Sequence, residues 1–278
     1  MRATDYGRSD QRYALEDLMT QVLKMWPLLT ATHHYDKSIS TRHRGQGQVI
    51  EAPILAYLIE TKHGRILYDV GCDYGKIADQ QQRDRYYDSK TFGFGAPNMQ
   101  EGQRLHHHLE RLGLTSADVD LVFLGHLHFD HAGGLCEVCG AEVHVQSDEL
   151  EAANSGLDPA YFPDDFSGDY RWKVMSGEYD LVPGVRALSS SGHTAGHMSL
   201  WVELPHGAPV ILCGDAADLE ENLRDEIAPG ICWQDSEEQA LASIRKLKHL
   251  AEQEKAQLWP NHDIAFWQTL RQFPDFHD

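Results

Sequence analysis

A run of metal-binding residue types directly after an apolar segment constrains this chain more than any other feature. Residues 120–125 (DLVFLG) have the pattern of a short buried strand, and His126, His128, Asp130 and His131 follow it. Residues two apart in an extended segment share a face, so His126 and His128 can point to one metal ion. A turn after His128 would bring Asp130 and His131 toward a second ion. Neutral imidazole and carboxylate are zinc ligands, and without a cation so many buried polar groups would be costly.

Three more candidate ligands occur further along the chain, and each directly follows an apolar segment. They are His193 within SGHTAGH, Asp215 after VILCG and His262 after LWPN. Taken singly, each position would more often be structural than catalytic. Their shared placement at expected strand ends makes them candidates for the same metal centre.

The apolar periodicity predicts an α/β fold. Ser236 and Gln239 form a capping box at the start of the longest expected helix. Strands followed by a helix and a further strand occur twice, which indicates two β-rich halves with helices outside, an αβ/βα sandwich. Strands are expected over 52–61, 65–70, 120–125, 141–146, 182–189, 198–204, 209–213 and 257–259, with further strand character in 21–41, and helices over 100–112 and 236–254. We expect residues 1–278 to form one domain, with about 1–19 as a polar N-terminal extension.

The segment 73–98 is irregular, charged and rich in aromatic residues, including Tyr86, Tyr87, Phe92 and Phe94. Long loops in compact domains are usually functional or disordered. Aromatic side chains are common in the walls of small-molecule sites. Two interpretations remain open, a lid or pocket wall and a surface loop held on the core by its rings.

Composition excludes several classes of function. The formal charge is −19, which argues against a general nucleic-acid binder and against attraction to anionic membranes. Apolar residues make up 41% of the chain, so a folded core is expected. No apolar run approaches the roughly 20 residues that span a bilayer. The N-terminal segment lacks an apolar signal region, so a cytoplasmic location is expected.

Two other groups of potential ligands are expected to be incidental. His106, His107 and His108 lie in the expected helix 100–112, where adjacent side chains diverge and cannot chelate one ion together. Cys136 and Cys139 lack the second pair that a zinc ribbon needs. The five cysteines are irregularly spaced and suggest no disulfide framework.

Over about residues 20–270, the chain resembles the metallo-β-lactamase superfamily, and within it the N-acyl-homoserine lactonases. The supporting strings are HLHFDHAGG, VPGV, GHTAGH, GDA and HDI. The resemblance implies a four-layer αβ/βα sandwich that holds two zinc ions per chain. One ion would bind His126, His128 and His193, the other Asp130, His131 and His262, with Asp215 between them. It leaves His197 a supporting or structural role and gives Asp69 a role in hydrogen-bonding the site.

The resemblance also implies a reaction, the opening of a lactone ring. Two close zinc ions lower the pKa of a bridging water, and the hydroxide attacks the ester carbonyl. Asp130 could help to move the proton to the leaving alcohol. The expected substrate is a small-molecule N-acyl-homoserine lactone, which would make the protein a quorum-quenching enzyme. A homodimer is possible.

Other functions are weighed on the same residues. Another lactone, such as a pyridoxolactone-like ring, and a thioester, as in glyoxalase II, remain alternatives, as does a non-catalytic metal-binding protein. A flavodiiron protein would usually carry Glu where this chain has His128, and a true β-lactamase lacks the carboxylate that Asp215 supplies. The charge of −19 makes a nucleic acid a poor substrate.

One position departs from the lactonase pattern. These lactonases usually carry a Tyr three residues after the bridging Asp, where this chain has Asp218. An ionised Asp cannot donate a hydrogen bond to a substrate carbonyl. Either another donor, such as a lid tyrosine, takes over, or Asp218 accepts a bond from a hydroxyl, amine or ring nitrogen of a different substrate.

Overall fold

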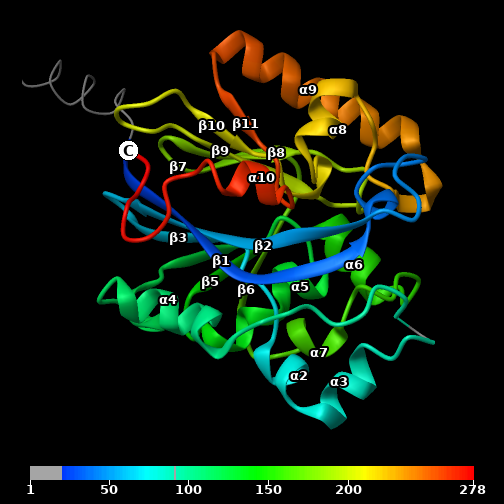
Figure 1. The fold of residues 1–278 in the computed structure, drawn as a ribbon. Helices are drawn as coiled ribbons and strands as arrows, with labels where there is room; N and C mark the ends of the chain where they lie inside the picture. The colour runs from blue at the N-terminus through cyan, green and yellow to red at the C-terminus, as the bar shows by residue number, and fades with distance from the viewer. Residues whose placement is uncertain (1–20, 91) are drawn as a thin grey trace, which may run out of the picture.

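Two β-sheets lie face to face between two outer layers of helices in a computed structural model, which describes residues 21–90 and 92–278 (Figure 1). The expected N-terminal extension lies outside the described residues. The predicted α/β class and four-layer αβ/βα sandwich are confirmed. The first sheet runs in the order β1 (Val22–Asp36), β2 (Val49–Thr61), β3 (Gly64–Tyr68), β4 (Leu121–Phe123), β5 (Glu142–Gln146), β6 (Arg171–Met175). The second runs in the order β11 (Gln257–Trp259), β10 (Val210–Leu212), β9 (Met198–Val202), β8 (Val185–Ser189), β7 (Tyr179–Val182).

Helices cover the outer face of each sheet (Figure 1). The helices α8 (Glu220–Asp225) and α9 (Glu237–Glu254) lie on the second sheet. On the far side of the first sheet are α2 (Tyr74–Ala78), α3 (Gln80–Tyr86), α4 (Leu105–Arg111), α5 (Phe129–Ala132), α6 (Ser147–Asn154) and α7 (Pro163–Phe166), while α10 (Ile264–Trp267) follows β11. Within the described ranges, no helix is both long and apolar enough to cross a bilayer.

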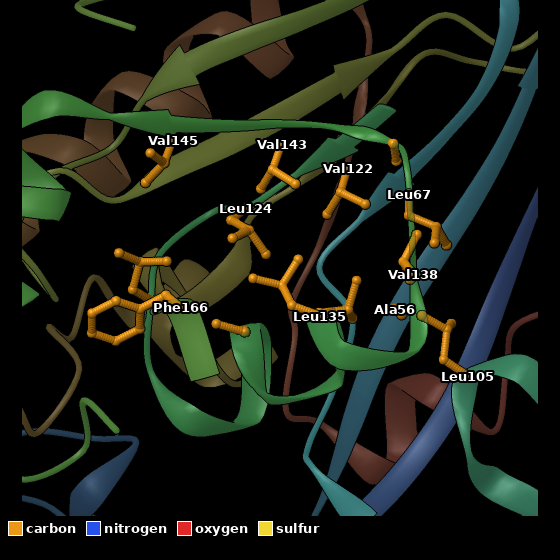
Figure 2. Close-up of a cluster of buried hydrophobic side chains, with 14 of the residues drawn as sticks. Ala56, Leu67, Leu105, Val122, Leu124, Leu135, Val138, Val143, Val145 and Phe166 are labelled. Carbon is orange, nitrogen blue, oxygen red and sulfur yellow. The ribbon is translucent and has the colours of Figure 1, made fainter. Parts of the chain in front are cut away.

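Strand β2 shows why the expected strands are apolar at nearly every position. Leu55, Tyr57 and Ile59 pack between the two sheets, and the alternate residues Ala56 and Leu58 pack toward the helices. A strand buried on both faces needs no polar alternation. Figure 2 shows the helix-side core, where Val122 of β4 and Val143 of β5 lie near Leu135 and Phe166.

The structure corrects four details of the predicted elements. Segment 73–98 contains two helices, α2 and α3, which begin at side-chain caps from Asp73 and Asp79. The expected strand 182–189 is the end of β7 and the whole of β8, separated by a turn in which Gly184 has a φ of 88°. Strand β6 was not predicted, and the expected helix 100–112 is a 3-10 turn followed by α4. The Ser236 cap of α9 is present.

Two parallel strand pairs determine where the site lies. Strand β3 pairs in parallel with β4, and β10 pairs in parallel with β11. Parallel neighbours end at the same edge of a sheet, and ligands in α/β folds bind outside such carboxyl ends. The loops after β4, β10 and β11 carry six of the seven predicted metal ligands, and the seventh, His193, lies in the loop after β8.

Candidate metal centre

The structure brings all seven predicted ligand residues together, and Asp218, which was predicted as a catalytic residue, lies beside them. Each of four overlapping groups has its potential ligand atoms within 4.8 Å of one another. The groups are His126, His128, His193; His126, His131, Asp215; Asp130, His131, His262; and Asp215, Asp218, His262.

The loop after β4 is pressed against the end of β3. The His131 carbonyl accepts a bond from the Val70 amide (2.9 Å), and Gly134 donates to Gly71 (3.0 Å). A Cβ at Gly134 would lie 2.0 Å from the Val70 carbonyl oxygen, so only glycine permits this approach. The turn begins at His128, and Asp130 and His131 lie on α5, as the motif predicts.

In the first group, hydrogen bonds to the outer ring nitrogens fix the orientation of two imidazoles. His128 donates from Nε2 to Asp158 (3.2 Å), and His193 donates from Nδ1 to the Ile231 carbonyl (3.2 Å). Their inner atoms, Nδ1 of His128 and Nε2 of His193, then face each other as lone pairs 3.1 Å apart. Two nitrogens on one tetrahedral zinc lie about 3.3 Å apart, so this spacing fits a shared ion.

The second group is held in the same way. His131 donates from Nδ1 to Asp69 (2.7 Å), whose other oxygen accepts from the Gly125 amide (2.8 Å). His262 donates from Nδ1 to the Pro53 carbonyl (2.8 Å). The Nε2 atoms of His131 and His262 each lie 3.2 Å from Oδ1 of Asp215. Asp69 therefore makes the supporting hydrogen bonds that the resemblance implies.

Asp215 is positioned from both sides. Its amide donates to Nε2 of His197 (2.9 Å), and Nδ2 of Asn261 donates to its Oδ1 (3.0 Å). His197 belongs to none of the four ligand groups and orients Asp215 through the backbone.

Glu149 on α6, which the sequence analysis missed, joins the two histidine-bearing loops. Its buried carboxylate accepts from the Leu127 amide (2.9 Å), the Tyr161 hydroxyl (2.8 Å), the Thr194 hydroxyl (2.7 Å) and the Gly196 amide (3.1 Å). Leu127 lies between two ligands of the first loop, and Thr194 follows a ligand in the second.

The donor set fits a pair of cations. Within the described ranges, the ring nitrogens of His126, Nε2 of His131 and Oδ1 of Asp218 are buried without a hydrogen-bond partner. Burial lowers the pKa of His126 and lowers that of His193 to about 4, which keeps both imidazoles in the neutral, metal-binding form.

The ligands around Asp215 carry an excess of negative charge. Although burial lowers it, Asp215 and neighbouring carboxylates raise the pKa of His262 to about 10. Burial and the charge of Asp215 raise the pKa of Asp218 to about 8. A cation among these ligands would balance the carboxylates and lower both values.

A pocket opens over the ligand groups. Its apolar wall contains Ile39, Phe94, Phe129, Ala160 and Ile231, and its polar wall contains His33, Tyr35, His128, Asp130, His193, Asp215, Asp218 and His262. The apolar wall suits an acyl chain, since such pockets are mostly apolar with a few placed polar groups.

The predicted aromatic segment forms part of this pocket. Phe94 lines it, while Tyr87 and Phe92 are buried against Phe129 and Phe162 beside it. Both interpretations of the segment therefore hold, for different residues. The tyrosine in the pocket is Tyr35 of β1 rather than one from segment 73–98, because Tyr86 and Tyr87 pack into the aromatic cluster.

The groups expected to be incidental lie outside the site. His106 contacts Glu137, His107 contacts Glu110, and His108 bonds to the Leu29 carbonyl. Among the described residues, no cysteine belongs to a ligand group, and the five cysteines are free thiols.

Comparisons with known proteins agree with this geometry. A model of the metallo-beta-lactamase superfamily matches residues 50–258. The N-acyl homoserine lactonase AiiA of Bacillus thuringiensis subsp. kurstaki is 33% identical over 230 residues, which cover 83% of this chain and 89% of that protein. The N-acyl homoserine lactonase AttM of Azorhizobium caulinodans is 28% identical over 258 residues, covering 85% and 91%.

The chain is also similar to solved structures of N-acyl homoserine lactone hydrolases. An N-acyl homoserine lactone hydrolase, with the product N-hexanoyl-L-homoserine at its catalytic metal centre, matches with a TM-score of 0.83 and 30% identity. The match covers 92% of this chain and 99% of that one. A quorum-quenching N-acyl homoserine lactone lactonase matches with a TM-score of 0.81 and 29% identity, covering 93% and 99%.

Proposed function

Because the chain belongs to the metallo-β-lactamase superfamily, we propose that it is a metal-dependent lactonase that opens the ring of N-acyl-homoserine lactones. The observation that carries this proposal is the convergence of seven His and Asp side chains at a pocket that is lined partly by apolar residues. The proposed substrate class is that of the similar lactonases. Hydrolysis of acyl-homoserine lactones, which bacteria use as quorum signals, would make the protein a quorum-quenching enzyme.

The metal would be held by residues already oriented for it. We assign His126, His128 and His193 to one ion, and Asp130, His131 and His262 to the other, with Asp215 shared. Zinc is the proposed metal because neutral imidazoles dominate the first group. When bound, the pair lowers the pKa of a water and polarises the ester carbonyl.

The chain's own groups orient the substrate and move a proton. The apolar wall, with Phe94 and Ile231, would hold the acyl chain and exclude water from it. Asp130 lies in the pocket wall with Oδ2 3.8 Å from Nε2 of His262. Its carboxylate is placed to take a proton from the attacking water and deliver it to the leaving alkoxide.

Metal analysis combined with a substrate panel tests this function. Purified protein should hold about two ions per chain, and it should open acyl-homoserine lactones in a pH-drop assay that also includes other lactones and a thioester. His128→Ala and Asp215→Ala should lose metal and activity together. Matched controls are His107→Gln and Cys139→Ser, which lie outside the ligand groups and should retain both. Full activity of a verified metal-free preparation would disprove the mechanism.

A further inference from the structure

We propose that Asp218 is an additional metal ligand, so that the ion bound by Asp130, His131 and His262 sits in a site with three carboxylates. This inference rests on the metal centre of the proposed function and adds a ligand to it. The first observation is position, since an Asp218 carboxylate oxygen, an Asp215 carboxylate oxygen and a His262 ring nitrogen lie within 4.8 Å of one another.

The backbone fixes this position. Asp218 follows β10, and the His262 amide donates to its carbonyl (2.8 Å). The neighbouring Asn261 amide donates to the Ala217 carbonyl (3.2 Å). These two bonds join the segments that follow β10 and β11, beyond the 3-10 turn Gly214–Ala216. Asp218 is therefore held beside a proposed ligand by structure that does not depend on side-chain rotation.

The second observation is an unsatisfied carboxylate oxygen. Asp218 is 4% exposed, and within the described part of the chain its Oδ1 has no hydrogen-bond partner. A buried acceptor left unpaired is costly, and a carboxylate more so. The proposed ligands His126 and His131 show the same combination of a buried atom and no partner. A cation between Asp218, Asp215 and His262 would satisfy this oxygen.

The protein offers this carboxylate little else. The Ser40 side chain bonds to it, and Ser40 Oγ lies 2.9 Å from the Tyr35 hydroxyl. None of the described residues that line the pocket is a lysine or arginine. Because Oδ1 is buried beside Asp215 and His262, an ion held among these ligands would reach it directly.

The consequence is a centre with two unlike halves. Asp218 shares a ligand group with Asp215 and His262, and His262 also belongs to the group of Asp130 and His131. The first ion would then have three imidazoles and a share of Asp215, while the second would have two imidazoles, Asp130, Asp218 and a share of Asp215. Carboxylate oxygens suit harder ions such as Mn²⁺, and imidazoles suit zinc. The second site should therefore accept Mn²⁺ more readily than the first.

Metal competition tests the ligand directly. Asp218→Asn and Asp218→Ala are compared with wild type by titrating apo-protein with Zn²⁺ and with Mn²⁺ against a chelator of known affinity. We expect the second ion to bind about 10-fold more weakly or worse in both variants, and the first ion to be unaffected, by analogy with the loss of groups that support metal ligands. Co²⁺-loaded protein gives an independent readout, because its visible bands strengthen when a site loses a ligand.

Tyr35→Phe is the matched control, because it removes a polar group beside Ser40 without touching a ligand atom. It should leave both metal affinities within about twofold of wild type, because Tyr35 lines the pocket but is not one of the proposed metal ligands. Circular dichroism of the apo-proteins checks folding, and if the Ala variant misfolds, the near-isosteric Asn variant decides.

Two results would overturn the proposal. One is unchanged metal affinity and Co²⁺ spectrum in both Asp218 variants. The other is unchanged metal binding with a raised KM for a lactone, which would make Asp218 a substrate-binding residue. Neither metal readout needs turnover, so a lack of lactonase activity would count against the proposed function alone.

Discussion

Glu149 is a single side chain on which the alignment of two ligand-bearing loops depends. Three of its four hydrogen bonds come from two segments that are distant in sequence, around Leu127 and around Thr194, and the fourth comes from the Tyr161 hydroxyl. A carboxylate can accept this many bonds because it has about four lone-pair positions and no donor of its own. Glutamine has the same shape but places an amide group against donors.

We therefore expect Glu149→Gln to lose about 2–4 kcal/mol of stability, the cost of leaving one or two buried donors unpaired. The misaligned loops should also weaken metal binding. Urea unfolding and metal titration measure the two effects. Glu151→Gln on the exposed face of the same helix is the control. Equal stability of Glu149→Gln and wild type would show that the carboxylate is not needed.

The residue scale also shows how far sequence reasoning reaches. The ligands from His126 to His131 were predictable because they occur in one short string whose strand and turn are local. Glu149 and Asp158 were not, because each acquires its role only from partners that the fold brings near. For Glu149, only its place soon after an apolar strand was visible.

At the scale of elements, α4 supplies a hydrogen bond at a point where the strand pairing of the first sheet is irregular. The pairing of β1 with β2 shifts register between Leu29 and Ala31. His108 of α4 donates from Nε2 to the Leu29 carbonyl (2.9 Å), and its Nδ1 accepts from Arg111. A doubly protonated ring could not accept from Arg111. Burial and Arg111 lower the pKa of His108 to about 4.

This pKa predicts a stability loss in acid. In the unfolded chain His108 takes up a proton near pH 6.5, but in the folded chain it resists protonation until about pH 4. The contribution of neutral His108 to the free energy of unfolding is therefore complete above pH 6.5. It is lost as the pH falls toward 4, by up to about 3 kcal/mol. Urea unfolding of wild type and His108→Gln across this range should show a smaller acid loss in the variant. Parallel curves would contradict the assignment.

The segment of α2, α3 and the aromatic residues after them shows why some elements escaped prediction. Helix α3 has the sequence QQQRDRY, which has no apolar periodicity and begins at a cap from Asp79. Its local signal was the cap alone. Strand β6 lies at the sheet edge and is mostly exposed, so it lacked the apolar run that marks a buried strand.

Phe94 links this segment to substrate choice. Its ring lines the pocket, so Phe94→Ala should raise KM for a long-chain acyl-homoserine lactone by about 5- to 30-fold, from roughly 1–2 kcal/mol of lost apolar contact. A lactone with a two-carbon acyl group should be nearly unaffected, and it serves as the internal control. Equal changes for both substrates would place the acyl chain elsewhere.

On the scale of the whole molecule, the metal centre joins the two sheets. Its ligands come from the loop after β4 in the first sheet and from loops after β8, β10 and β11 in the second. The αβ/βα arrangement could be predicted because apolar strands and helices alternate in order. The pairing of strands between distant segments, such as β10 with β11, was not visible in any local pattern.

Removing the metal should therefore loosen the whole sandwich. An ion at 100 times its Kd stabilises the folded state by about 2.7 kcal/mol, which for a chain of this size corresponds to about 5–10 °C in Tm. Calorimetry with and without chelator should show a decrease of at least this size, and added zinc should reverse it. An unchanged Tm in protein shown to be metal-free would mean that the site does not link the sheets.

The order of the ligands along the chain also has a consequence for synthesis. A growing polypeptide contains all three histidines of the first group once residue 193 is made, but the second group needs His262. The first group of ligands is therefore complete in the chain before the second, and loading of the two positions is separable in time. Metal availability during translation would then bear on the first position before the second.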